Sequence, residues 1–204
     1  MTGTTIVMLS GWAGSGKDAA AHILVTKHGF KRVAFADALK LDAAQRAGLP
    51  LSTFHSAAKD EALQTPCPAF PTAKTPRDIL LQLALQMRAE NPDIYADSVV
   101  HQIAETSSDR QFVVSDWRYR REVNRIQEMM PSAHILRVRM QRPGIFASND
   151  PSEHDLDNEP MDLIIENNKG LSDLELMIAA LASRIASTEV HLQERHGDGS
   201  GMHR

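Results

Sequence analysis

A glycine-rich loop near the start of this 204-residue sequence is the feature that most constrains its fold. The loop reads Gly-Trp-Ala-Gly-Ser-Gly-Lys-Asp over residues 11–18, after the apolar run Ile6–Leu9 and before a helix-like segment that starts at Ala19. This order predicts a strand, a glycine loop and a helix. Glycines let the backbone approach an anion closely, and the N-terminus of the following helix favours negative charge. We therefore expect the loop to bind phosphate groups.

The spacing G-x-x-x-x-G-K is that of a Walker A motif, which cradles the phosphates of a nucleoside triphosphate. The alternative is a tight turn whose glycines only pack. Lys17 is expected to reach the β- and γ-phosphates as a mobile positive charge. Asp18 replaces the usual Ser or Thr, and it either ligates Mg²⁺ or only stabilises the helix N-terminus. We expect ATP and Mg²⁺ as cofactors, with these nucleotide-binding residues: Gly11, Trp12, Ala13, Gly14, Ser15, Gly16, Lys17 and Asp18.

Composition limits the class of protein further. Hydrophobic residues make up 42% of the chain, which is enough for one good core. Cys67 is the single cysteine, which excludes a disulfide within the chain. The sequence has no signal-peptide pattern and no apolar run of about 20 residues, so we expect a cytoplasmic protein without a membrane partner. The net charge of −4 gives no general attraction to nucleic acid.

The alternation of strand-like and helix-like segments predicts an α/β fold with three layers and a central, mostly parallel sheet, as in P-loop NTPases. We expect residues 1–196 to form one domain and the glycine-rich residues 197–204 to be a disordered tail. Within the domain, residues 48–106 are expected to form an insertion on the acceptor side, and residues 140–158 a small lid.

Cap residues predict several helix boundaries. Gly29 and Gly48 are expected to follow the ends of the first two helices. Thr75 and Pro76 are expected to begin another, as the N-cap and the first helical residue. Prolines between residues 65 and 71 exclude a regular helix or a central strand. This segment is interpreted as a surface excursion that either covers the substrate or is an inert loop.

Two segments carry residues suited to a phosphate acceptor. Asp37 and Lys40 follow a predicted strand over residues 30–35, at the sheet edge where open α/β folds bind ligands. Asp37 either orients the acceptor and takes its proton or only caps a helix. Arg77 and Arg88 lie three turns apart on a predicted helix, so both can face one cleft and grip a monophosphate. The alternative is a pair of solvated arginines.

The apolar segment 111–115 ends in Asp116, a pattern typical of a Walker B element whose carboxylate binds magnesium directly or through water. The competing interpretation is that Asp116 caps the next helix. Trp117 and Arg118 come next, within a segment, 117–121, of three arginines and two aromatic residues. This segment is either a platform for a nucleobase and phosphates or the exposed first turn of a helix.

A polar segment after the predicted strand 133–139 is interpreted as a lid that closes over the transferred phosphoryl group. Arg139 and Arg142 are its candidate charge-stabilising side chains. The Glu-His-Asp sequence at 153–155 matches no metal-ligand spacing, so a loop of hydrogen-bonded polar groups is the simpler interpretation.

The ordered set of motifs resembles the bacteriophage-type deoxynucleoside monophosphate kinases. The resemblance implies ATP- and Mg²⁺-dependent phosphorylation of a deoxynucleoside monophosphate to the diphosphate, in the host cytoplasm. It places Asp37 and Arg77 in the acceptor site, and Asp116 with Arg118 near the metal and phosphates. The matching motifs are the loop at 11–18, Phe-Ala-Asp-Ala-Leu-Lys at 35–40, Thr-Pro-Arg at 75–77, Ser-Asp-Trp-Arg at 115–118, Arg-Pro at 142–143, Ser-Glu at 152–153 and the stretch 162–174.

Two departures from the family pattern leave other functions open. The chain has Leu83–Gln86 where the family continues with a Gly-Thr-Glu-like step, and Trp117 where a small aliphatic residue is common. Related phage kinases phosphorylate the hydroxymethyl group of a pyrimidine such as 5-hydroxymethyluracil in DNA during base hypermodification, and segment 117–121 would then meet a flipped base. The third hypothesis is a non-catalytic nucleotide-binding module, against which a second phosphate site argues.

These interpretations assign roles to individual residues. The expected partners are ATP and a deoxynucleotide, with modified DNA as the alternative, and the sequence leaves a homodimer open. The predicted catalytic residues are Lys17, Asp37, Arg77, Asp116, Arg118 and Arg142; the substrate-binding residues are Asp37, Lys40, Arg77, Arg88, Trp117, Arg118 and Arg139; and the metal ligands are Asp18 and Asp116.

Overall fold

A parallel sheet of five strands forms the centre of the structure, a computed structural model that describes residues 3–106, 110–148 and 151–197. The strand order is β2-β3-β1-β4-β5, and every neighbouring pair runs parallel. This confirms the predicted α/β class with a parallel sheet. The strands are β1 (Thr5–Ser10), β2 (Lys31–Val33), β3 (Gln111–Val114), β4 (His134–Gln141) and β5 (Leu163–Glu166).

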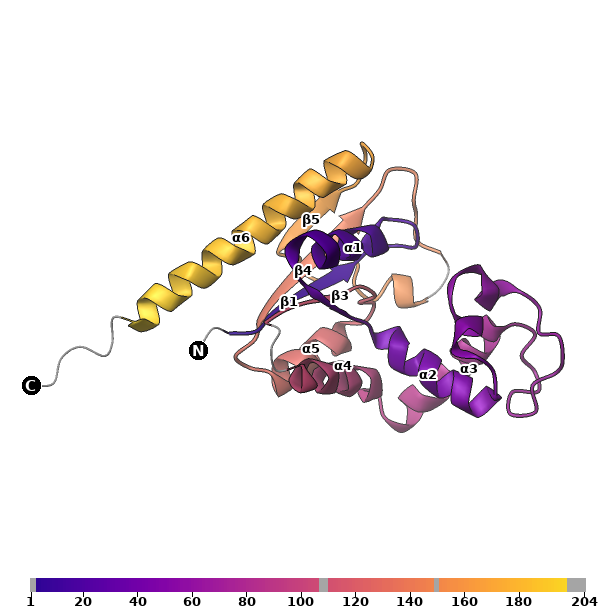
Figure 1. Cartoon of the computed structure of the whole chain (residues 1–204). Coiled ribbons are helices and arrows are strands. Elements are labelled where there is room, and N and C mark those ends of the chain that lie inside the picture. Colours follow the sequence, from indigo (N-terminus) through magenta and orange to yellow (C-terminus); the bar gives the residue numbers. More distant parts are fainter. Residues whose placement is uncertain (1–2, 107–109, 149–150, 198–204) are drawn as a thin grey trace, which may run out of the picture.

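Helices cover both faces of the sheet and complete the three predicted layers. Figure 1 shows α1 and α6 on one side of the sheet and α4 and α5 on the other. None of the helices in the described ranges is long and apolar enough to cross a membrane. The helices are α1 (Lys17–His28), α2 (Phe35–Ala47), α3 (Pro76–Glu90), α4 (Ile94–Glu105), α5 (Arg120–Met129) and α6 (Leu171–Gly197).

The central strand β1 divides its side chains between two cores. Val7 and Leu9 pack with α1 and α6, whereas Ile6 and Met8 pack with residues of α4 and α5. This division follows from the period of two along a strand. Every residue of β1 is buried, as expected for a parallel strand that is covered on both faces. The carboxyl end of β1 therefore delivers the glycine loop to a fixed position at the middle of the sheet.

The helix ends follow the cap signals. Gly29 and Gly48 follow α1 and α2 in the left-handed conformation, with φ of 74° and 64°, as predicted. At the start of α3, the Thr75 hydroxyl accepts a hydrogen bond from the Asp78 N–H, and the Asp78 carboxylate accepts one from the Thr75 N–H. Of the tail predicted over 197–204, Gly197 instead ends α6 and the other residues lie outside the described ranges.

The second strand is shorter than predicted. The sequence indicated a strand over residues 30–35, but β2 ends at Val33 and α2 begins at Phe35. The reason is that the Asp116 carboxylate binds the first two N–H groups of α2, which stabilises the helix there. Asp37 therefore lies in the first turn of α2 rather than at the end of a strand.

Residues 49–75, between α2 and α3, form a small core with those two helices. Two short 3₁₀ helices, η1 (Leu51–Phe54) and η2 (Ser56–Asp60), begin this segment. The side chains of Phe54, Cys67 and Phe70 are buried against residues of α2 and α3. The excursion predicted from the prolines is therefore anchored by apolar contacts, and it lies beside α2 and α3 away from the sheet (Figure 1).

Replacing the central side chain of this small core tests its contribution to stability. The Phe54→Ala variant should lower the free energy of unfolding by about 3–5 kcal/mol, because the ring is fully buried and leaves a cavity. Leu51→Ala, an exposed residue of the same short helix, is the control and should change it by less than about 1 kcal/mol. Denaturant titration of both variants measures the difference. Equal, small effects would show that the segment does not share in the cooperative fold.

Candidate active site

The glycine loop connects β1 to α1 in a shape that requires glycine. Gly11, Gly14 and Gly16 have φ of 128°, 81° and 107°, values that side chains rarely adopt. The space around two of them is also filled. A Cβ on Gly11 would lie 2.3 Å from the Met140 carbonyl oxygen, and a Cβ on Gly16 would lie 2.4 Å from the side-chain nitrogen of Asn167. The glycines of the motif are thus fixed by packing against β4 and the end of β5.

The loop presents unpaired backbone donors. The Ser15 N–H donates to the Trp12 carbonyl at 3.1 Å and closes a turn. The N–H groups of Gly14 and Gly16 donate to no acceptor in the part of the chain that the structure describes. The first N–H groups of α1 have no acceptor within the helix. Together with the helix dipole, these donors form a concave site for an anion.

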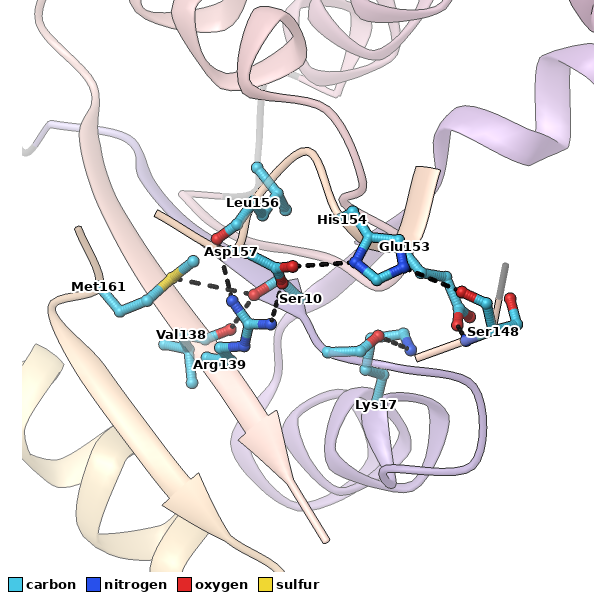
Figure 2. A network of polar contacts seen from close by, with 11 residues as sticks. Ser10, Lys17, Val138, Arg139, Ser148, Glu153, His154, Leu156, Asp157 and Met161 are labelled. Atoms are coloured by element: carbon cyan, nitrogen blue, oxygen red, sulfur yellow. Dashed lines mark hydrogen bonds and ion pairs between the residues drawn. The ribbon is translucent and has the colours of Figure 1, made fainter. Parts of the chain in front are cut away.

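Lys17 lies across the mouth of this loop. Its ammonium donates hydrogen bonds to the carbonyl oxygens of Gly11 and, at 2.9 Å, of Trp12, as Figure 2 shows for Lys17 and its neighbours. Burial lowers the pKa of the Lys17 ammonium, and the positive charge of Arg118 acts in the same direction, while nearby carboxylates oppose this. The ammonium can therefore exchange two carbonyl partners for phosphate oxygens without leaving the loop.

Two polar atoms within the loop fit the requirements of a bound nucleotide. Ser15 Oγ and Trp12 Nε1 are buried and have no hydrogen-bond partner among the described residues. A buried polar group without a partner is costly, and a ligand's oxygen or nitrogen atoms can supply one. The loop therefore combines free backbone donors, a cation and unsatisfied side-chain groups at one place.

Asp116 caps a helix other than the one that follows it. Its Oδ1 accepts the Phe35 N–H at 3.0 Å and its Oδ2 accepts the Ala36 N–H at 2.8 Å, so it holds the start of α2 beside the end of β3. Burial raises the pKa of the Asp116 carboxyl, and the two N–H groups oppose that rise. Each carboxylate oxygen has a further lone pair, so this capping role leaves room for a water-mediated metal contact.

Asp18 and Asp116 are the carboxylates that the sequence indicated for Mg²⁺. Asp18 lies in the first turn of α1, directly after Lys17, and Asp116 lies just beyond the end of β3, the strand beside β1. Hard oxygen donors of this kind suit Mg²⁺, which keeps several waters and phosphate oxygens in its shell. Within the described ranges, no group of three or more His, Cys, Asp and Glu side chains is arranged to hold a metal by itself. A protein-only metal site is thus absent from this part of the chain.

Asp37 lies in a cluster of charges at the start of α2. Its carboxylate pairs with Arg32 at 2.7 Å and with Lys40 at 3.8 Å. Arg32 also donates from Nε to the Ser115 hydroxyl at 3.1 Å. Arg32 could not be identified from the sequence, because an arginine on a short strand gives no signal of its own. Its position in the strand that precedes Asp37 was the available hint.

Arg77 and Arg88 contact different partners. Arg77, at the start of α3, forms a two-pronged ion pair with Asp60 of η2. Arg88 lies over the rings of two tyrosines, 5.1 and 4.5 Å from their centroids, and donates to Glu122 at 3.5 Å. The two positions are separated by about 16 Å along α3. The structure therefore does not bring these two arginines together around one phosphate.

Trp117 differs from its predicted role. Its side chain is only 1% exposed and belongs to the core between the sheet and α5, and its Nε1 donates to the Tyr119 carbonyl at 2.8 Å. The ring therefore offers no surface for stacking a base, contrary to the sequence prediction. Two neighbouring arginines are also engaged, Arg120 with Glu159 at 2.8 Å and Arg121 with Asp93 at 2.6 Å.

The segment that follows β4 contacts the glycine loop directly. Glu153 accepts the Ala13 N–H at 3.2 Å, and it accepts the Ser148 N–H at 2.7 Å, a contact that Figure 2 shows. The Arg118 guanidinium donates to the Ser152 hydroxyl at 3.1 Å. Hydrogen bonds from these N–H groups lower the pKa of the Glu153 carboxyl, although partial burial acts against this. The Ser-Glu motif at 152–153 was visible in the sequence, but neither side chain was predicted to belong to the site.

Arg139, a residue of β4, binds the segment that follows this strand. It donates to the Leu156 carbonyl at 2.9 Å and pairs with Asp157 at 3.0 Å (Figure 2). It also lies over the Trp12 ring, 5.7 Å from the ring centroid. Arg142 is exposed, and its side chain has no ion-pair or hydrogen-bond partner among residues 3–106, 110–148 and 151–197. Of the two arginines predicted for the lid, one is therefore structural in this arrangement and the other is available for an anion.

The space between the loop and this segment is narrow. Its pocket, lined by Gly11, Arg118 and Glu153 among others, has a volume of about 10 Å³, room for about one water molecule. A triphosphate does not fit there unless the segment moves. The contacts of Glu153 and Ser152 thus describe a closed arrangement over the loop.

Comparisons with known proteins give partial likenesses. No model of a known protein family matches the chain, and no curated protein matches its sequence. A sugar kinase from Janibacter sp. HTCC2649 has 16% identity and a TM-score of 0.47 over 92% of this chain and 98% of its own. The dephospho-CoA kinase from Campylobacter jejuni has 14% identity and a TM-score of 0.46 over 88% of this chain and 96% of its own. These likenesses concern the backbone arrangement alone.

Removing the charge of Glu153 should strengthen ATP binding. The Glu153→Gln variant keeps the size of the side chain but weakens its hold on the Ala13 N–H, because a charged acceptor binds more strongly than a neutral one. We expect the Kd for MgATP, measured by calorimetry, to fall about fivefold. Glu105→Gln, an exposed residue of α4 with the same change in charge, is the control. An equal Kd in both variants would show that Glu153 does not compete with phosphate.

Glu122 makes stability depend on pH in an unusual direction. Burial raises the pKa of this carboxyl to about 7 from 4.5, although the N–H groups of Arg118 and Tyr119 donate to it at 3.1 and 3.0 Å. Between these two values the folded chain retains a proton that the unfolded chain has released. The contribution of Glu122 to the free energy of unfolding therefore decreases as the pH rises through this window.

The Glu122→Gln variant should lack this contribution. Denaturant titrations give the free energy of unfolding at pH 5 and at pH 7. The decrease between these two pH values should be smaller in the variant than in the parent protein, by roughly 1–3 kcal/mol. Glu128→Gln, an exposed residue of the same helix, is the control and should keep the parent slope. An unchanged slope in the Glu122 variant would mean that this carboxyl ionises near its usual pH.

Proposed function

We propose that this chain is an ATP- and Mg²⁺-dependent phosphotransferase that converts a deoxynucleoside monophosphate to the diphosphate. The observation that carries the proposal is the glycine loop at the carboxyl end of β1. Its free N–H groups, the N-terminus of α1 and the Lys17 ammonium converge on one position. The oxygens of a nucleoside triphosphate suit this set of donors, as expected for a G-x-x-x-x-G-K loop. In this proposal residues 1–196 form one catalytic domain.

ATP binding proceeds by exchange of partners at the loop. Lys17 gives up the carbonyl oxygens of Gly11 and Trp12 for β- and γ-phosphate oxygens. The Ala13 N–H becomes free when Glu153 withdraws, and the Gly14 and Gly16 N–H groups are free already. Asp18 and Asp116 would hold Mg²⁺, which neutralises charge on the phosphates.

The acceptor is proposed to bind beside the start of α2. A charged cluster lies there, formed by Arg32, Asp37 and Lys40. Asp116 holds the start of α2, and with it this cluster, beside the end of β3. Arg118 lines the same small pocket as Gly11 and Glu153, and its guanidinium is proposed to contact the acceptor phosphate near the γ-phosphate. Arg77 is proposed to leave its ion pair with Asp60 and to bind the acceptor instead.

The chemistry requires positioning more than proton transfer. An oxygen of the acceptor monophosphate attacks the γ-phosphorus, the bond from that phosphorus to the β-phosphate oxygen breaks, and ADP leaves with the electron pair. The attacking oxygen is already ionised near neutral pH, so no base is needed. Lys17 and Arg118 offset the charge of the transferring group, and Asp37 orients the acceptor through Arg32. Closure of the predicted lid, residues 140–158, with Arg142 would exclude water.

The choice of a deoxynucleoside monophosphate rests on the ordered motifs of the sequence. Kinase action on a hydroxymethylpyrimidine in DNA has less support, because the Trp117 ring is enclosed in the core. Arg120 and Arg121, which would have contacted DNA phosphates, pair with carboxylates instead. DNA is therefore retained as one arm of the test.

Transfer of label from γ-labelled ATP with Mg²⁺ tests the proposal. The reaction is run in parallel on the deoxynucleoside monophosphates and on DNA that contains 5-hydroxymethyluracil. We expect label in a deoxynucleoside diphosphate. Label in the polymer would assign the chain to DNA modification, and ATP hydrolysis or binding without transfer would leave a nucleotide-binding module.

The Lys17→Ala variant should lose transfer by at least about 100-fold, because no other cation contacts the loop in the same way. Its melting temperature should stay near that of the parent protein, since the half-buried Lys17 ammonium contacts only two carbonyl oxygens of the loop. Lys27→Ala, on the same helix and paired with Glu175, is the control and should keep full activity. Undiminished turnover in the Lys17 variant would contradict the proposed function.

A further inference from the structure

Asn167, the first residue after β5, joins the glycine loop to the sheet. Its side-chain nitrogen donates to the Ser15 carbonyl oxygen at 3.1 Å, and both groups are buried. Its backbone N–H donates to the Gln141 carbonyl at 2.7 Å, which continues the pairing of β5 with β4. The amide is therefore held by the sheet and in turn holds one carbonyl of the loop.

The fit between this amide and the loop is close. A Cβ on Gly16 would lie 2.4 Å from the Asn167 side-chain nitrogen, so any other residue at position 16 would displace this amide. Gly16 also has a φ of 107°, a value that glycine adopts freely. Glycine on the C-terminal side of a peptide group permits that group to rotate. The Ser15–Gly16 peptide therefore needs an external anchor to keep one orientation.

The orientation of this peptide decides where a phosphate donor points. The described chain contains no cis peptide bond, so the Ser15 carbonyl and the Gly16 N–H point in opposite directions from the same plane. Because Asn167 fixes the carbonyl, it also fixes the N–H, which faces away from Asn167 and has no partner in the described chain. A rotated peptide would instead present a carbonyl oxygen to an incoming phosphate and repel it.

We propose that Asn167 is a positioning residue for phosphate binding, which holds the Ser15–Gly16 peptide so that the Gly16 N–H faces the phosphates of ATP. The inference deepens the proposed function and rests on the loop binding ATP. Asn167 acts through the backbone of the loop and does not itself contact the phosphates. Its effect should consequently be confined to ligands that reach the loop.

The Asn167→Asp variant tests this role with almost no change in shape. The substitution replaces the donating nitrogen by an oxygen that repels the Ser15 carbonyl, and so releases the peptide. Asn167→Ala removes the donor without adding charge. Asn168→Asp is the matched control, because it adds the same charge at the next, exposed position. All three variants are made in the full chain.

Calorimetry with MgATP should show binding about tenfold weaker in both Asn167 variants than in the Asn168 control, as expected for the loss of one buried hydrogen bond. The KM for the acceptor, measured at saturating ATP, should stay unchanged. Melting temperatures are recorded for each variant so that stability and affinity are separated. A split between the two substrates is a result that a purely structural role would not produce.

Other outcomes overturn the inference in distinguishable ways. If the Asn167 and Asn168 variants bind MgATP equally well, Asn167 does not position the loop. If the acceptor KM rises as much as the Kd for MgATP, in step with a lower melting temperature, Asn167 only stabilises the fold. If the parent protein itself binds no MgATP, the proposed function fails before any variant is compared.

Discussion

The close contact of the glycine loop with the ends of β4 and β5 is the constraint on which the site depends. Gly11 lies against the Met140 carbonyl and Gly16 against the Asn167 amide, so a Cβ at either position would displace a neighbouring group. These contacts exist only because β1, β4 and β5 are parallel and adjacent, with Ser10 opposite Arg139. The shape of a phosphate-binding loop is thus set by the register of the sheet as well as by its own sequence.

Features that depend on neighbouring residues could be predicted from the sequence. The glycine loop, the left-handed Gly29 after α1 and the N-cap at Thr75 are encoded within a few residues, and the structure has each of them. The all-parallel sheet also followed from the alternation of strand-like and helix-like segments. Local steric and hydrogen-bonding preferences are sufficient for such features.

Features that depend on partners distant in the chain could not be predicted. The Asp116 carboxylate caps α2 by accepting the N–H of Ala36, which lies 80 residues earlier in the chain. Glu153 accepts the N–H of Ala13, which lies 140 residues earlier. Trp117 looked like a surface residue because it precedes a run of charged residues, yet its ring fills the core. Packing between elements decides these placements, and a single sequence carries no direct record of which elements meet.

The site arginines differ in how easily each can leave its carboxylate partner to bind a phosphate. Arg32 and Arg77 pair with Asp37 and Asp60 in partly exposed positions, where such pairs contribute little and a dianionic phosphate can displace a carboxylate. Arg88 is different, because it packs on tyrosine rings beside the buried Glu122, and its withdrawal would leave that carboxyl without a cation. Arg88 therefore stabilises the junction of α3 and α5, while Arg32 and Arg77 remain free to change partners.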